Sequence, residues 1–97
     1  MKIPKIPSRV KIMNKVVYEI VWVDSFKNPE TLGECRPAQR QIALKSGQSE
    51  QSTFKTFIHE LSHAMCIERG IEISHNAIYD LENAVFYLLF HNDWAKK

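Results

Sequence analysis

The chain contains 97 residues, enough for one domain, since most domains have about 100–150 residues. Hydrophobic residues make up 44% of the sequence and charged residues 25%, with 3 Gly and 4 Pro, which excludes disordered, collagen-like and repeat proteins. We therefore expect a single domain, residues 1–97, with one small core that a bound metal ion would help to stabilise.

The positive charge is concentrated at the start of the chain. The formal net charge is only +2, from 13 basic and 11 acidic residues. Five basic residues nevertheless precede Glu19, the first acidic one: Lys2, Lys5, Arg9, Lys11 and Lys15. Such an arm could contact a phosphate backbone, but no aromatic residues alternate with the charges as they do on a base-stacking surface. A solvated strand edge is the favoured interpretation, and nucleic acid is a weakly supported partner.

The cysteines and the apolar segments bear on the compartment. Cys35 and Cys66 are too few for a disulfide scaffold, and the first residues lack the apolar stretch of a signal peptide. The longest apolar run, residues 84–90, is far shorter than the roughly 20 residues that span a bilayer. The sequence therefore predicts a cytoplasmic protein with reduced thiols and no membrane partner, and it indicates no oligomeric state.

The first half of the chain is predicted to form strands. Residues 9–13 and 16–23 flank a turn at Asn14-Lys15, and residues 32–36 and 40–45 flank a turn at residues 37–39. Residues 24–31 form a loop with an Asn28-Pro29 turn signal. Alternation along residues 16–23 predicts one apolar face toward the core: Val16, Tyr18, Ile20 and Trp22.

The second half is predicted to be helical. Ser49 or Ser52 can cap a helix that ends near Gly70, and its apolar positions recur with helical spacing: Phe54, Phe57, Leu61, Ala64 and Met65. Ser74 can cap a second helix that runs to about Asn92, with another apolar stripe: Ile78, Leu81, Val85 and Leu89. Strands followed by helices predict an α+β fold, in which two hairpins form a small, mostly antiparallel sheet and two packed helices follow.

The first helix carries an HExxH motif at residues 59–63. Residues i and i+4 share a helical face, so the imidazoles of His59 and His63 can bind one Zn²⁺ ion. Glu60 lies about 100° round the helix from His59, where it can take a proton from zinc-bound water. The apolar stripe is roughly opposite the histidines, which favours a metal site over two histidines that are merely hydrogen-bonded.

A zinc hydrolase needs a third protein ligand, and two candidates lie downstream. Glu82 follows His63 after 18 residues and is surrounded by apolar positions on the second helix, where a carboxylate is costly unless a cation meets it. His75 follows after 11 residues and is the alternative ligand. The two lie about 10 Å apart along a helix that begins by Ser74, so both cannot bind one ion.

Four further residues have weaker claims. His75 or Tyr79 could instead donate a hydrogen bond to the oxyanion of a transition state. Asp80 is predicted on the solvent side of the second helix, with Asn83, Tyr87 and His91. Cys66 lies three residues after His63 on the same face, and we favour a buried thiol over a metal ligand there.

HExxH followed by 18 residues and Glu, on two consecutive helices after a short sheet, resembles the gluzincin metallopeptidases. More narrowly, the chain is similar to small single-domain metallopeptidases of bacteriophages and prophages. These have an opening hairpin, a Leu-Gly-Glu-Cys-like segment, a second strand and a Thr-x-x-His-Glu-x-x-His-Ala motif. The matching segments here are residues 32–35, 40–45, 56–64, 80–84 and 92–93.

The resemblance implies a minimal zincin-like fold with one Zn²⁺ per chain, bound by His59, His63 and Glu82, and Glu60 as general base and acid. Larger gluzincins often place an acid four residues after the ligand Glu to orient a histidine, but that position here is Phe86. A phage-encoded protein of this kind would act in the host cytoplasm.

These observations predict a zinc metallopeptidase that hydrolyses a peptide or protein substrate lying extended along the sheet edge. The alternative, from another functional class, is a zinc-stabilised, non-catalytic binding module that could also associate with nucleic acid.

Overall fold

The computed structural model describes residues 3–91, apart from the side chain of Phe90. Its elements in chain order are β1 (Arg9–Met13), β2 (Val16–Val23), β3 (Gly33–Arg36), β4 (Gln41–Lys45), α1 (Glu50–Arg69) and α2 (His75–Phe90). The predicted positions Lys2, Asn92 and Asp93 lie outside the described residues. Neither helix combines the length and the apolar character that crossing a membrane requires, as far as residues 3–91 are concerned.

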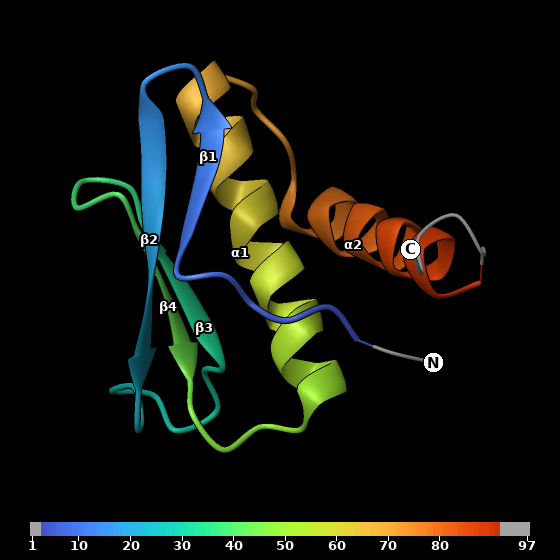
Figure 1. Ribbon diagram of the computed structural model, residues 1–97. Helices are drawn as coiled ribbons and strands as arrows, with labels where there is room; N and C mark the ends of the chain where they lie inside the picture. The colour runs from blue at the N-terminus through green and yellow to red at the C-terminus, as the bar shows by residue number, and fades with distance from the viewer. Residues whose placement is uncertain (1–2, 92–97) are drawn as a thin grey trace.

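The four strands form one sheet in the order β1-β2-β4-β3. The hairpins β1–β2 and β3–β4 are antiparallel, as predicted, and they join through a parallel pairing of β2 with β4 that sets Ile20 beside Ile42. The result is the expected small, mostly antiparallel sheet followed by two helices (Figure 1). Because β3 pairs only with β4, its other edge is free within the described sheet.

Local sequence signals set most of the boundaries. Lys15 and Arg40 adopt positive φ angles in the two hairpin turns, where the chain reverses within a few residues. The Ser49 side chain accepts a hydrogen bond from the Ser52 backbone N–H at the start of α1. Gly70 ends α1 in the left-handed conformation at φ 65°, which lets the Ile71 N–H reach the Cys66 carbonyl.

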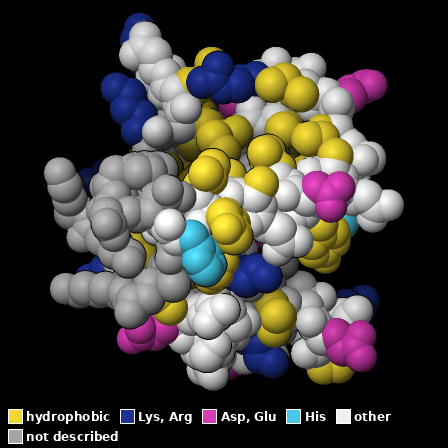
Figure 2. All heavy atoms as spheres, turned by 90° about the vertical axis from the view of Figure 1, so that its right-hand side faces the viewer, with side chains coloured by type: hydrophobic (Ala, Val, Ile, Leu, Met, Phe, Trp, Pro, Cys, Tyr) yellow, Lys and Arg dark blue, Asp and Glu magenta, His cyan; other side chains and the backbone are white. Residues whose placement is uncertain are grey.

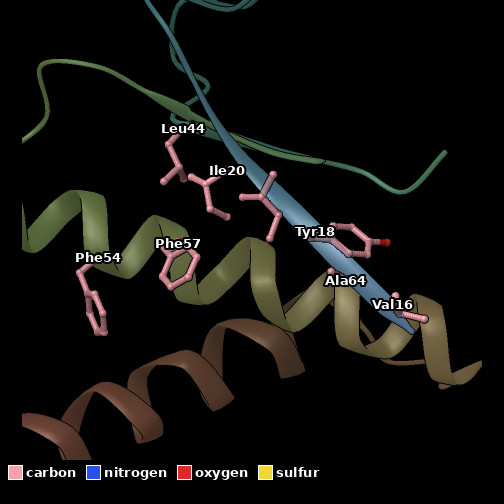
Figure 3. Packing of buried hydrophobic residues seen from close by; sticks show 8 residues of the cluster. Val16, Tyr18, Ile20, Leu44, Phe54, Phe57 and Ala64 are labelled. Atoms are coloured by element: carbon pink, nitrogen blue, oxygen red, sulfur yellow. The ribbon is translucent and has the colours of Figure 1, made fainter. Parts of the chain in front are cut away.

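Helix α1 lies across one face of the sheet, and the hydrophobic core fills the space between them (Figure 3). Tyr18 and Ile20 on β2 and Leu44 on β4 point toward α1, which presents Phe57 and Ala64 to the sheet. The Tyr18 hydroxyl donates a 2.6 Å hydrogen bond to Glu68, so this buried tyrosine keeps a polar partner. Burial between the two layers thus fixes the rotation of α1 about its axis.

Helix α2 packs against α1 on the side away from the sheet (Figure 1). Phe86 on α2 contacts Phe54 on α1, with ring centroids 6.4 Å apart. Because only one helix covers α2, hydrophobic side chains gather on the exposed surface of this side of the molecule (Figure 2). Asp80, Asn83, Tyr87 and His91 are exposed, which confirms their predicted solvent side.

Three predicted core positions are wrong. Trp22 is 51% exposed, and it lines an open hollow between the N-terminal segment, residues 3–6, and the start of α1. Met65 and Leu81 are also exposed, since the contact between α1 and α2 is narrow and leaves part of each apolar stripe uncovered. Periodicity finds the apolar face of an element but does not say how far the covering layer extends.

Replacing Leu44 with Ala should reduce the free energy of unfolding by about 2–5 kcal/mol, because the side chain is fully buried between β4 and α1. Ile67→Ala is the control, since Ile67 is 51% exposed on α1, and it should change that energy by less than about 0.5 kcal/mol. Urea unfolding followed by circular dichroism measures both. Equal destabilisation by the two substitutions would contradict the described core.

Candidate metal centre

Three histidines from two helices meet at the contact between α1 and α2. His59 and His63 lie one turn apart on α1, and His75 is the first residue of α2, whose start is fixed by the Ser74 cap. The Nε2 atoms of His59 and His63 are 3.2 Å apart. One ring nitrogen from each of the three histidines lies within 4.8 Å of the others.

This spacing fits a metal ion with nitrogen ligands. Two nitrogens bound about 2.0–2.1 Å from a tetrahedral Zn²⁺ ion lie about 3.3 Å apart, close to the His59–His63 separation. The His75 ring is exposed, and its centroid is 5.1 Å from that of His59 and 5.2 Å from that of His63. Three imidazoles with an open side are the ligand pattern of a catalytic zinc site.

Glu82 reaches the same centre from behind His59. Its Oε2 atom lies 3.0 Å from Nδ1 of His59, and both side chains are buried. When Nδ1–H donates to the carboxylate, Nε2 keeps its lone pair, and this is the nitrogen that faces His63. A carboxylate behind a ligating histidine fixes the tautomer and the orientation of the ring.

The two candidates for the third ligand therefore take different places. The structure brings His75 among the ligand atoms and puts Glu82 against the far nitrogen of His59. Glu82 is buried among apolar positions as the sequence predicts, but its partner is the His59 imidazole. The carboxylate that orients a histidine, missing at Phe86, is thus supplied by Glu82 itself.

Glu60 lines the same cleft as His59 and His75 and packs under β3. The Cα of Gly33 passes so close that a Cβ there would lie 3.2 Å from the Glu60 Cγ and would collide with the Thr56 methyl group. Burial, together with Glu82 and Glu34, raises the pKa of Glu60 to about 7, while a hydrogen bond from the Cys35 backbone N–H opposes the shift. A bound cation would act in the same direction as that N–H.

The pKa of His63 is lowered by burial and by the neighbouring imidazoles of His59 and His75. A lowered pKa keeps the ring neutral at neutral pH. Metal ions bind the neutral form of imidazole, so this environment favours a ligand role for His63.

The remaining predicted positions are peripheral. The Tyr79 ring lies 4.7 Å from that of His59 and 5.0 Å from that of His75, and it is about half exposed at the mouth of the site. Asp80 is exposed on the other side of α2. Cys66 is half-buried and does not belong to the cluster of ligand atoms found among the described residues.

The centre opens into a cleft of about 740 Å³ between α1, α2 and the segment that leads into β3. Its walls include Thr31, Leu32 and Gly33 on one side and His75 and Tyr79 on the other. Of the described basic residues in the N-terminal arm, Arg9, Lys11 and Lys15 lie in or beside β1, at the opposite edge of the sheet, whereas Lys5 lies near the start of α1. The β1 part of the arm and the cleft are therefore separate surfaces.

Sequence reasoning missed two residues of the site. Gly33 belongs to the Leu-Gly-Glu-Cys-like segment, and a glycine inside a strand often marks a close approach of two backbones. Lys55 lines the cleft one turn before His59, and its helical spacing from the motif was the available signal. The Cys35 N–H that meets Glu60 carries no side-chain signal.

Comparison of the chain with models of known families, with curated proteins and with solved structures finds no match.

His75→Ala should abolish high-affinity zinc binding, because it removes a ligand, whereas Glu82→Gln should weaken binding by about 10–100-fold, because it removes only the partner of His59. Competition with a chelator, together with native mass spectrometry, measures both affinities. His91→Ala, a change of an exposed histidine outside the cluster, is the control and should bind zinc normally. If Glu82→Gln loses zinc completely and His75→Ala retains it, the ligand set is His59, His63 and Glu82.

Gly33→Ala should reduce the free energy of unfolding by about 1–3 kcal/mol, because the new methyl group collides with Thr56 and crowds Glu60. Adding Thr56→Ser removes the colliding Thr56 methyl group and keeps the hydroxyl that bonds to Gln48. Chemical denaturation should therefore show partial recovery in the double variant. Strictly additive losses would show that β3 and α1 are not in this contact.

Proposed function

We propose that this chain is a zinc-dependent peptidase. The observation that carries the proposal is that His59, His63 and His75 form one cluster, and that His59 and His75 line an open cleft together with the buried Glu60 carboxyl group. The HExxH spacing supports the same chemistry, because it supplies two ligands and a general base from consecutive turns of one helix. The active-site assignment is His59, His63 and His75 as ligands, with Glu82 orienting His59.

His59, His63 and His75 would hold a zinc ion, which would supply a Lewis acid for the scissile carbonyl and would lower the pKa of a water molecule toward about 7. Glu60 would take a proton from the attacking water and pass it to the leaving nitrogen, so that it would act first as base and then as acid. The close contact with β3 keeps the Glu60 side chain in one orientation. Tyr79, at the mouth of the cleft, is placed to donate a hydrogen bond to the developing oxyanion.

The free edge of β3 is the place for an extended substrate. β3 is an edge strand of the sheet, and Leu32 and Gly33 at its start line the cleft. A peptide that adds as an antiparallel strand would gain main-chain hydrogen bonds there and would pass beside Glu60.

Glu60→Gln should retain zinc and lower the rate of peptide hydrolysis by about 10²–10⁴-fold, because an amide cannot transfer the proton. Cleavage of a mixed peptide library, followed by mass spectrometry, measures the rate without knowledge of the substrate. Glu72→Gln, an exposed change outside the cleft, is the control and should cut normally. An unchanged rate in zinc-loaded Glu60→Gln would refute the mechanism.

A non-catalytic, zinc-stabilised module is the second candidate, favoured by the position of His75. A metal bound by His59, His63 and His75 would link α2 to α1, and α2 has few other contacts in the described part of the fold. This candidate predicts that chelation lowers the melting temperature while the zinc-loaded wild type cleaves no library peptide.

A further inference from the structure

The cleft continues beyond the histidines along the N-terminal half of α1. Its walls there include Ser49, Gln51, Ser52 and Lys55 from α1, and Glu30 and Thr31 from the segment before β3. Lys55 is the one lysine or arginine among the described residues that line the cleft. The acidic residues that line it are Glu30, Glu60 and Glu82.

Lys55 is placed by the same helical geometry as the zinc ligands. It precedes His59 by four residues, so both lie on one face of α1, about 6 Å apart along its axis. Its Nζ lies 5.5 Å from the centre of the Phe86 ring on α2. A cation over an aromatic face is held there without a counter-charge.

The ammonium group has no carboxylate partner in the part of the chain that the structure describes, where no ion pair includes Lys55. Glu82 is committed to His59, and Glu60 is packed against β3. Glu30 shares the cleft wall but forms no ion pair with Lys55. The half-buried Lys55 therefore offers its charge to whatever enters the cleft.

The direction of β3 indicates which part of a bound peptide would lie near Lys55. Gly33 lies beside Thr56, the neighbour of Lys55, while Cys35 is two residues further along β3, beside Glu60. An antiparallel peptide would run from the Arg36 end of β3 toward Leu32. Its residues beyond the scissile bond, on the C-terminal side, would then approach Lys55.

We propose that Lys55 is a specificity-determining residue that binds a substrate carboxylate on the C-terminal side of the scissile bond. This inference rests on the proposed peptidase function. The carboxylate is either an Asp or Glu side chain or the free C-terminus of the peptide, and both have the same chemistry for an ammonium group. The N-terminal end of α1 adds a partial positive charge at the same end of the cleft.

The test separates binding from cleavage. Binding is measured by calorimetry on zinc-loaded Glu60→Gln, which is expected not to turn over. Four alanine-based hexapeptides, all blocked at the N-terminus, serve as probes. One has a C-terminal amide and one a free C-terminal carboxylate, and the other two are amidated and carry Glu or Gln near the C-terminus. Cleavage of the same peptides is measured with the protein that retains Glu60.

Each measurement is repeated with Lys55→Met, which keeps the apolar stem, and with Lys55→Arg, which keeps the charge. Lys11→Met, at the opposite edge of the sheet, is the matched control. At least one carboxylate peptide should bind about tenfold or more tightly than its neutral counterpart. That advantage should vanish in Lys55→Met, persist in Lys55→Arg and in Lys11→Met, and weaken with added salt.

The preferred peptide identifies the source of the carboxylate. Selective binding of the free C-terminus indicates a carboxypeptidase-like site, and selective binding of the Glu peptide indicates an internal acidic residue. Equal affinity for charged and neutral peptides, or no binding of any of the four, overturns the role of Lys55. Carboxylate-selective binding without cleavage refutes the peptidase function but supports the carboxylate site at Lys55. Cleavage that does not depend on the charge of the peptide supports the peptidase function but refutes the role of Lys55.

Discussion

The hydrogen bond between Glu82 and His59 is the interaction on which the site depends. It joins α1 to α2 through two buried groups that would each be costly to bury alone. It also pairs Nδ1 of His59 with the Glu82 carboxylate and leaves Nε2 facing His63 in the histidine cluster. One contact thus joins the two helices and orients the imidazole that we propose as a zinc ligand.

A second constraint acts from the sheet side. β3 approaches α1 so closely at Gly33 that no side chain fits there, and this approach confines Glu60 between a strand and its own helix. The carboxyl group is consequently buried near other acids, and its pKa rises to about 7. The carboxyl group that we propose as the general base is thus positioned by packing against the sheet, whereas the histidines that we propose as ligands are brought together by packing between the helices.

The cleft is electrostatically uneven as a result. Glu82 is held by His59 and Glu60 by packing against β3, while Lys55 is held over Phe86 with its charge uncompensated in the described structure. A peptide in this cleft would meet a proton acceptor at one point and a cation about one helical turn away. The separation of these two groups would orient a bound peptide, which a metal site on a single helix could not do alone.

The sequence by itself determined the strands, the hairpin turns, the Ser74 cap and the pairing of His59 with His63, because these follow from spacing and local hydrogen bonding within a few residues. For the first helix it left the cap open between Ser49 and Ser52, and the structure shows Ser49. The sequence also marked Glu82 as a buried carboxylate and His75 as an alternative ligand, but it could not divide the roles between them. That division depends on the position of α2 along the axis of α1, and this position is set by packing between side chains that are distant in the chain. The same long-range packing decided that Trp22 is exposed and that Gly33 meets Glu60, because tertiary structure alone fixes where one layer ends and how closely the next approaches.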